Sequence, residues 1–550
     1  RKGYMKTDIQ IEKATPKLPI SEVASRLGLG EDDYLPHGRH IAKLPYSLLK
    51  QGKRKARGKL VLVTAMSPTP SGEGKTTTSI GLTDALNLIG RKASLAVREP
   101  SLGPYFGIKG GGTGGGKAQI VPAEDINLHF TGDIAAVAKS ANLLAALIDN
   151  HLHHANKLGI DQRRITWKRV VDLNDRALRD IVIGLGGPLH GVPRKDGFYI
   201  APASEIMAIL CMATSFPDLR GRIKKIIFGY TRDRKPLTCE DLGVDAAMSV
   251  LLRDAILPNL VQTLGHSPTF VHGGPFANIA HGCSSVIASR LGLQMSDFLI
   301  TEAGFGSDLG AEKFFNLKCR LSGLRPDVAV IVATLKAVEF HGGYSSGGGW
   351  DNLSRHIDNV RQFGVTPVVA INRFPDDSPR TLNRLRKACE KKRVRCAVSD
   401  VYRNGGEGGV ELAEAVKAAA ARSDPKKFKL LYPDKMKLRD KIQTIARKVY
   451  GARGVNYTKE ASGLLDHFEE MGFGKLPICM AKTPMSFTDN PTLVGARKDF
   501  DITVTSAMLS AGAGFVVAIA GNVIPMPGLP KVPAALRVRI DDEGNLIDMA

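Results

Sequence analysis

The chain has 550 residues, enough for about three to four domain-sized units. A hydrophobic content of 43% and a charged content of 24% are those of an ordinary soluble globular protein. The formal net charge of +22 indicates an anionic partner, which could be nucleic acid, a membrane surface or polyanionic small molecules. The basic residues are dispersed, and the sequence has no zinc-finger spacing, RNP-like aromatic motif or basic coiled coil, which argues against a nucleic-acid-binding protein.

Two features predict a cytoplasmic protein without a membrane span. The seven cysteines form no C-x-x-C pair, and their odd number, together with the lack of an apolar stretch in residues 1–10, indicates reduced thiols. Residues 502–530 carry no charge and are long enough to suggest a membrane helix. Glycines and prolines divide this span into two strand-like pieces, so we expect buried strands with turns between them.

A strand, a glycine-rich loop and a helix follow one another near residue 70. The run KLVLVTAM, residues 59–66, predicts a short buried strand. Residues 75–89 carry apolar side chains at helical spacing, and Gly90 is expected to end that helix. This order brings the backbone N–H groups of a helix start together around an anion.

The loop itself matches most of the phosphate-loop pattern G-x-x-x-x-G-K-[ST]. Gly74, Lys75 and Thr76 fit its end, while Thr69 stands at the place of the first glycine. The alternative is a glycine-rich turn with a solvated lysine. A lysine beside the positive end of a helix dipole is unfavourable unless an anion is bound there, so the segment predicts a phosphate site.

The next apolar run, KASLAVREP, predicts a second strand that ends at Arg98 and Glu99. Ligands of open α/β sheets lie outside the carboxyl ends of the strands. We therefore expect Arg98 to point toward the bound phosphates.

Further along the chain, an α/β alternation returns. Three apolar runs predict buried parallel strands, and a stripe of apolar residues predicts a helix between the last two; these are strands 327–338, 366–374 and 395–402 and helix 379–393. A strand, helix and strand in this order place the two flanking strands side by side and parallel. Phe374 and Tyr402 would then lie at one edge of the sheet, where they could enclose a flat ring, although the spacing taken alone favours core or rim packing.

The sequence resembles the formate–tetrahydrofolate ligase family, also called 10-formyltetrahydrofolate synthetases. The resemblance extends from Met5 to the C-terminus and rests on long segments, among them PTPSGEGKTTT, EDINLHFTGD at 124–133, FVHGGPFANIAHGC at 270–283 and TEAGFGSDLGAEKF at 301–314. The threonine at the first glycine position of the loop is the family's own version of that motif.

This resemblance implies an ATP-dependent ligase that joins formate to tetrahydrofolate and gives 10-formyltetrahydrofolate, ADP and phosphate through a formyl phosphate intermediate. It implies that Lys75 and Arg98 are catalytic, Lys75 bridging the moving phosphoryl group and Arg98 binding formyl phosphate through its planar guanidinium. The implied metal is Mg²⁺, bound by the Thr76 hydroxyl. The implied ATP-binding residues are Thr69, Pro70, Ser71, Gly72, Glu73, Gly74, Lys75 and Thr76.

For the folate, the resemblance implies binding by Phe374, Tyr402, Phe305 and Glu99, with the first two clamping the pterin ring. The family usually has a tryptophan at the position of Tyr402 and a longer segment than residues 344–359. The resemblance also implies a homotetramer and activation by a monovalent cation such as potassium or ammonium. The expected partners are ATP, formate and tetrahydrofolate, with no nucleic acid and no membrane.

The expected fold is an α/β protein with a mostly parallel, P-loop NTPase-like sheet, helices on both faces and additional α/β domains. The predicted domains are a discontinuous nucleotide-binding domain (5–105 with 260–355), a second α/β domain (106–259) and a folate-side α/β domain (356–550). Two other functions are considered. One is a P-loop ATPase of the partitioning or nitrogenase-reductase kind that uses hydrolysis as a switch, and the other is a basic, non-enzymatic nucleic-acid binder.

Overall fold

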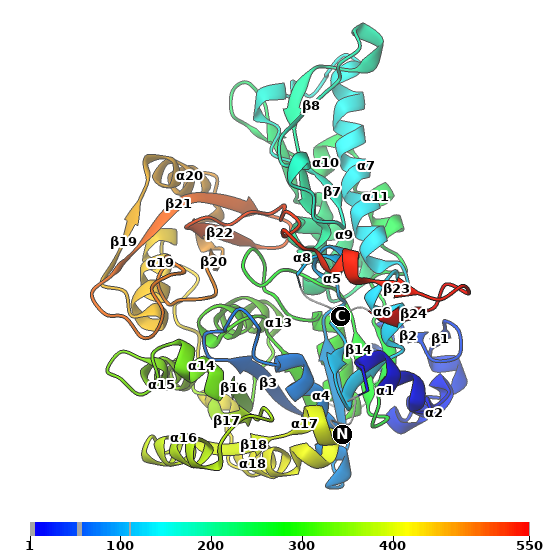
Figure 1. Ribbon diagram of the computed structural model, residues 1–550. Coiled ribbons are helices and arrows are strands. Elements are labelled where there is room, and N and C mark those ends of the chain that lie inside the picture. Colours follow the sequence, from blue (N-terminus) through cyan, green and yellow to red (C-terminus); the bar gives the residue numbers. More distant parts are fainter. Residues whose placement is uncertain (1–5, 52–57, 109–111, 549–550) are drawn as a thin grey trace.

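A twelve-stranded sheet forms the centre of the molecule, in a computed structural model that describes residues 6–51, 58–108 and 112–548. Six neighbouring strand pairs, from β14 to β18 in the sheet order, are parallel, which confirms the mostly parallel α/β class (Figure 1). In sheet order the strands are β1 (Leu35–Pro36), β2 (Ala42–Lys43), β13 (Asn259–Thr263), β14 (Pro268–Val271), β4 (Ala93–Val97), β15 (Phe298–Glu302), β3 (Lys59–Ala65), β16 (Val328–Ala333), β17 (Thr366–Asn372) and β18 (Arg395–Ser399). β6 (Ala118–Val121) also pairs with β13, and β5 (Gly114–Gly115) pairs with β6.

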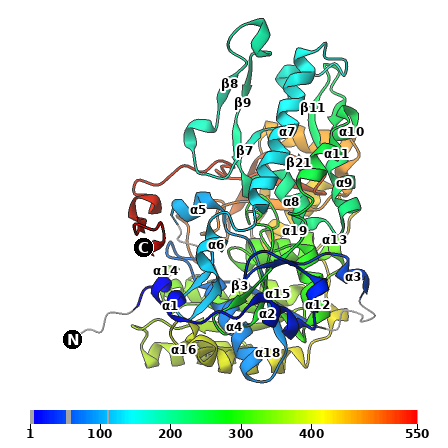
Figure 2. The same ribbon diagram turned by 90° about the vertical axis from the view of Figure 1, so that its right-hand side faces the viewer.

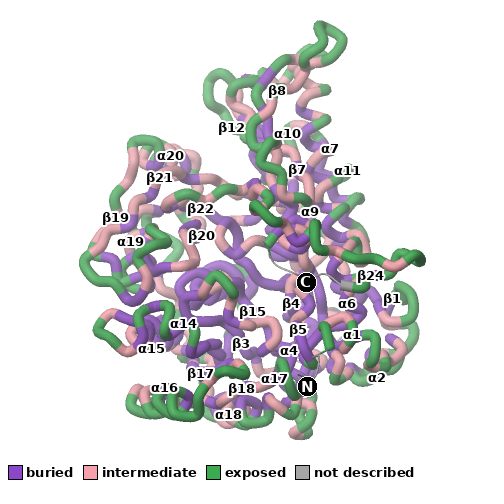
Figure 3. The backbone as a smooth tube through the Cα atoms, in the orientation of Figure 1, coloured by how far each residue is buried: buried purple, intermediate pink, exposed green. Residues whose placement is uncertain are grey.

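Helices cover both faces of this sheet because alternate strand residues are apolar on both sides. In β3, Leu60 and Leu62 belong to one buried cluster, and Val61 and Val63 belong to the other. One face packs against α4 (Lys75–Leu88) and α18 (Val410–Ala420), and the other against α12 (Val286–Met295) and α15 (Gly349–Gln362). In Figure 3 the strands of the main sheet are largely buried and the outer helices largely exposed.

The predicted elements of this sheet are confirmed with two adjustments at strand ends. β17 and β18 are parallel neighbours joined by α16 (Pro379–Lys391). β16 stops at Ala333 because the Thr334 side chain caps a helix, α14 (Leu335–Phe340), where the sequence predicts further strand. β18 stops at Ser399, so Tyr402 lies on α17 (Val401–Asn404).

The strand order separates the two strands that flank the phosphate loop. β15 lies between β3 and β4 and is parallel to both, with Ile300 opposite Val61 on one side and opposite Leu95 on the other. The ends of β3 and β4 are therefore about two strand spacings apart, roughly 10 Å. A ligand that lies between them would extend across the end of β15.

The chain leaves the main sheet twice to form smaller regions. We call residues 133–258 the middle region and residues 431–520 the C-terminal region. The middle region has α7 (Asp133–His153), α8 (Glu205–Met212), α9 (Phe216–Lys224), α11 (Asp245–Leu251) and paired strands β7 (Arg169–Val171) with β10 (Phe198–Ile200), β8 (Ile181–Ile183) with β9 (Arg194–Asp196) and β11 (Ile227–Tyr230) with β12 (Pro236–Thr238). The β8–β9 hairpin projects from the end farthest from the main sheet (Figures 1 and 2).

The C-terminal region is built on a four-stranded sheet. Its strands, in sheet order, are β19 (Gly454–Tyr457), β21 (Asp501–Ser510), β22 (Phe515–Ala520) and β20 (Ile478–Ala481), and its longer helices are α19 (Leu438–Ile445) and α20 (Lys459–Glu470). β21 and β22 confirm that the uncharged span forms strands. In the described parts of the chain, no helix is long and apolar enough to cross a membrane.

One predicted domain boundary, at 355/356, falls between strands of the main sheet. β17 and β18 pair within the main sheet, although residues 366–399 lie beyond the predicted boundary at 355/356. Residue 5, the predicted start of the first domain, lies outside the described residues. The division stays a prediction.

Candidate active site at the carboxyl edge of the main sheet

The phosphate-loop motif has the expected local structure. β3 ends at Ala65, and α4 begins at Lys75, so the loop leads directly into a helix start. Gly74 precedes the helix with φ +72°, a left-handed conformation that favours glycine. A side chain there would also meet Asn372, because an ideal Cβ would lie 2.5 Å from its Nδ2 atom.

Glu73 holds the loop rather than facing solvent. It is 1% exposed, and its carboxylate accepts hydrogen bonds from the Thr69 backbone N–H at 2.7 Å and from the Thr334 hydroxyl at 2.5 Å. Asn372 donates from Nδ2 to the Glu73 carbonyl oxygen at 3.1 Å. The ends of β16 and β17 therefore fix the loop, which leaves its backbone N–H groups preorganised for an anion.

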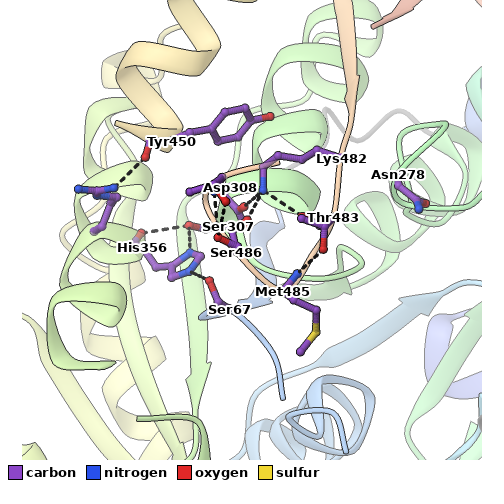
Figure 4. Close-up of polar contacts among 12 residues, drawn as sticks. Ser67, Asn278, Ser307, Asp308, His356, Tyr450, Lys482, Thr483, Met485 and Ser486 are labelled. Carbon is purple, nitrogen blue, oxygen red and sulfur yellow. Dashed lines mark hydrogen bonds and ion pairs between the residues drawn. The ribbon is translucent and has the colours of Figure 1, made fainter. Parts of the chain in front are cut away.

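A buried histidine supports the start of the loop (Figure 4). Nε2 of His356 lies 3.1 Å from the Ser67 hydroxyl, and Nδ1 lies 2.7 Å from the Ser307 hydroxyl. Burial lowers the pKa of His356 to about 3, so the ring is neutral and one nitrogen donates while the other accepts. Next to it, the ion pair between Lys482 and Asp308, 3.0 Å apart and fully buried, connects this site to the C-terminal region.

Thr76 meets an acidic partner from a distant part of the chain. Its hydroxyl donates to Oε2 of Glu302 at 2.8 Å, and Glu302 is the last residue of β15. A hydroxyl and a carboxylate oxygen beside a phosphate loop are the hard oxygen ligands that Mg²⁺ takes together with phosphate oxygens. The residues present therefore fit the predicted metal, and Glu302 is a second candidate ligand beside Thr76.

Arg98 follows β4 and reaches the loop after β15. Its guanidinium donates from one terminal nitrogen to the Pro275 carbonyl oxygen at 3.2 Å, and it packs on Gly304, where a Cβ would lie 3.3 Å from the other terminal nitrogen. Nε of Arg98 is buried without a hydrogen-bond partner among the described residues. The Nε–H group of Arg98 can therefore still donate a hydrogen bond at the carboxyl end of β4.

Glu99 follows Arg98 in the chain, and Phe305 follows Gly304, on which the Arg98 guanidinium packs. Glu99 is 3% exposed, and burial, followed by the negative charge of Asp133, raises its pKa well above the ordinary value. Its Oε2 has no hydrogen-bond partner in the described part of the chain. Phe305 is half-buried and has φ +61°, which is strained for an aromatic residue and fixes where its ring stands.

His281 is a further polar residue near Arg98. It is fully buried, both ring nitrogens lack a partner among the residues described, and burial, followed by the charges of Lys318 and Arg98, lowers its pKa to about 3. Unsatisfied buried groups are rare and mark places where a ligand or water completes the hydrogen bonding. Such groups on Arg98, Glu99 and His281 therefore make the end of β4 a candidate binding site.

Phe374 and Tyr402 follow neighbouring strands but contact different groups. Lys336 Nζ lies 4.4 Å from the centre of the half-buried Phe374 ring. Tyr402 is 50% exposed, donates to Oδ1 of Asp8 at 3.3 Å and packs on Gly116, where a Cβ would lie 2.9 Å from its ring. Phe374 follows the end of β17 by two residues and Tyr402 follows the end of β18 by three, and among the described residues no ring contact joins the two.

The sequence reading missed residues that act from a distance along the chain. Glu302 could have been found from the sequence, because it ends an apolar strand and so lies at the same sheet edge as Arg98. Asn372 ends β17 and Thr334 follows the last residue of β16, but their role depends on contact with Glu73, which spacing alone does not reveal.

The fold and this edge define an α/β enzyme with a phosphate loop, a carboxylate partner for its threonine and an arginine two strands away. The sequence model of the family described as formate–tetrahydrofolate ligase matches residues 6–550. The chain is also 52% identical to the formate–tetrahydrofolate ligase of Paracoccus denitrificans (strain Pd 1222), over 98% of this chain and 99% of that protein. The chain belongs to the formate–tetrahydrofolate ligase family and is a ligase enzyme.

Proposed function

We propose that the enzyme uses ATP to join formate to tetrahydrofolate and releases 10-formyltetrahydrofolate, ADP and phosphate. The observation that carries this proposal is the phosphate loop beside the Thr76–Glu302 contact, together with Arg98 at the end of β4. In the sheet, β4 is the second strand from β3, with β15 between them. A switch ATPase needs the loop and the metal ligands, but it needs no second anion site. Arg98 and the unsatisfied groups around it supply such a site.

Two transfers account for the products. A formate oxygen attacks the γ-phosphorus of ATP, the bond to the bridging oxygen breaks, and ADP leaves with formyl phosphate remaining. Nitrogen 10 of tetrahydrofolate then attacks the formyl carbon, loses its proton, and the carbon–oxygen bond to phosphate breaks. Placement and charge neutralisation suffice for both steps, so no covalent enzyme intermediate is required.

The residues have distinct tasks in this scheme. Lys75 and the loop N–H groups, with Thr69, Pro70, Ser71 and Gly72, bind the nucleotide phosphates. Arg98 binds formyl phosphate through paired N–H donors. Thr76 and Glu302 would hold Mg²⁺, which supplies charge neutralisation on the phosphates when bound.

The folate side of the proposal rests on aromatic surface. Phe374 and Tyr402 would contact the pterin ring, since each presents an exposed part of its ring at the edge of the sheet. Phe305 and Glu99 would contact the same substrate from the loop after β15 and the end of β4. A neutral Glu99, favoured by its raised pKa, can donate a hydrogen bond to a ring nitrogen or carbonyl oxygen.

Release of ADP measured with each substrate omitted in turn tests this function. Full turnover that requires ATP, formate and tetrahydrofolate together supports the ligase. Equal ADP release without formate would instead support a switch ATPase, and binding to DNA with a steep salt dependence and no turnover would support a nucleic-acid binder.

Three further properties remain proposals. We propose a homotetramer, tested by light scattering after gel filtration, and a cytoplasmic location, tested by cell fractionation. We also propose activation by a monovalent cation, tested by turnover in potassium or ammonium against sodium at constant ionic strength.

A further inference from the structure

A cleft of about 700 Å³ lies between the middle region and the C-terminal region. Its first wall comes from the segment that leads into β7 and from β10, α8 and β11, and its second wall comes from α20, β21 and β22. Figure 1 shows these two regions side by side above the main sheet. Among the described residues that line the cleft, none belongs to the phosphate loop or is Arg98 or Glu302, so the cleft is separate from the candidate active site.

The size and lining of the cleft are those of a small-molecule site. Pockets of roughly 300–1,000 Å³ bind drug-sized ligands, chiefly through apolar and aromatic side chains. Trp167, Tyr199, Phe468 and Phe515 supply aromatic surface here. Tyr230 and His467 face each other from the two walls, with ring centres 5.7 Å apart and an angle of 49° between the rings. These rings favour a flat ligand over a flexible chain.

Glu205 is one of the charged side chains that line the cleft, together with Arg164, Lys168, Arg234, Asp466 and Glu470. Glu205 begins α8, and its Oε1 accepts hydrogen bonds from the backbone N–H groups of Gly512 at 2.7 Å and Ala513 at 3.3 Å. In the described part of the chain, no hydrogen bond reaches Oε2 of Glu205. Burial raises the pKa of this group to about 7. An N–H donor on a ligand would satisfy the free oxygen.

We propose that this cleft binds a flat nitrogen heterocycle that carries an amino group, with the ring between the aromatic walls and the amino group donating to Oε2 of Glu205. Adenine-type and pterin-type bases share this chemistry. An aromatic ring without an N–H donor would leave the carboxyl group unsatisfied and is therefore a poorer ligand.

The floor of the cleft connects it to the active site. Ile279 and Ala280 line the cleft, and the next residue, His281, lies near Arg98. The same segment contains Pro275, whose carbonyl oxygen accepts a hydrogen bond from Arg98. A ligand in the cleft therefore contacts the segment that positions Arg98, and we expect it to change turnover. This effect rests on the proposed function, whereas binding in the cleft does not.

Calorimetric titration of the full-length enzyme with pterin, with adenine and with purine tests the proposal, the last two as their 9-methyl derivatives so that purine has no N–H donor. Glu205→Gln keeps an oxygen for Gly512 and Ala513 but replaces the free acceptor by an NH₂ donor. We expect this change to weaken adenine or pterin binding by at least about tenfold, because a donor then faces a donor, and to leave purine binding nearly unchanged. Glu470→Gln is the matched control, since Glu470 is exposed at the same cleft and should not alter binding.

A second variant separates the cleft from the active site. Leu464→Trp adds bulk from a half-buried position on α20 and should abolish the same binding event, with the fold checked by circular dichroism. If adenine and pterin bind the wild type and both variants equally, or if neither binds the wild type below about 10 mM, the proposal is overturned. If binding behaves as expected but ADP release needs no formate, the proposed ligase function fails and the cleft site stands.

Discussion

The phosphate loop and the aromatic rim, by which we mean Phe374 and Tyr402, both follow strands of the main sheet, but they differ in burial and in hydrogen bonding. Glu73 of the loop is 1% exposed and bonded to two partners, whereas Tyr402 of the rim is 50% exposed with one long hydrogen bond. The loop thus has its shape before any substrate arrives. The rim offers surface that only a substrate would bury, so substitutions in the loop should affect turnover and substitutions in the rim should affect affinity.

Lys75→Ala should have the largest effect. Loss of the lysine at the helix start should reduce turnover by about 100-fold or more, which corresponds to at least roughly 2.7 kcal/mol of the barrier. Steady-state ADP release, with circular dichroism to check the fold, measures this. More than about a tenth of wild-type turnover would show that the loop does not contact the transferred phosphoryl group.

Arg98→Lys should come next. A point charge cannot reproduce the planar pair of donors, so we expect turnover to fall by about 10- to 100-fold while the dissociation constant of ATP changes by less than about threefold. Nucleotide titration and steady-state kinetics together give both values. Equal losses in the two would place Arg98 on ATP instead of formyl phosphate.

Phe374→Ala should act on the folate alone. Removal of one aromatic wall costs roughly 1.4 kcal/mol or more, so the folate KM should rise by at least about tenfold. The KM values for ATP and formate, measured on the same preparation, serve as controls. An unchanged folate KM would mean that Phe374 only packs under Lys336.

Tyr402→Trp should have the smallest effect and the opposite sign. Tryptophan offers a larger stacking face, worth very roughly 0.5–1.5 kcal/mol, so the folate KM should fall by a few-fold. The substitution also removes the hydrogen bond to Asp8 and presses on Gly116, and both changes limit the gain. A shift of the ATP constant instead would show that the rim belongs to the nucleotide site.

The sequence allowed prediction of the parts of this site whose signals are local. The strand, loop and helix from Lys59 to Leu88 and the crossover from Thr366 to Ser399 form as the apolar spacing predicts. The helix of the crossover buries one periodic stripe, whereas α4 is buried on all sides from Thr78 to Leu86. The family resemblance, through long motifs, gave the activity that the comparisons bear out.

Contacts between segments that are distant in the chain could not be predicted from the sequence. β15 between β3 and β4, Glu302 on Thr76 and Thr334 on Glu73 all depend on strand order, which local propensity does not encode. Likewise, Tyr402 lies on a short helix because the Asp400 backbone leaves the extended conformation, with φ −119° and ψ 40°. Spacing alone could not locate that bend.

The place of β15 has a consequence for biosynthesis. Thr76 and Glu302 are 226 positions apart, and the strand that ends at Glu302 fills the gap between two strands made much earlier. A growing chain folds from its N-terminus as it leaves the ribosome. The edges of β3 and β4 that pair with β15 therefore stay without that partner until residues 298–302 have been synthesised. Unpaired strand edges are sites of aberrant pairing. The proposed phosphate site is thus a late product of synthesis although its motif is among the first segments made, and a nascent chain stalled before residue 298 would carry the complete motif without Glu302 beside Thr76.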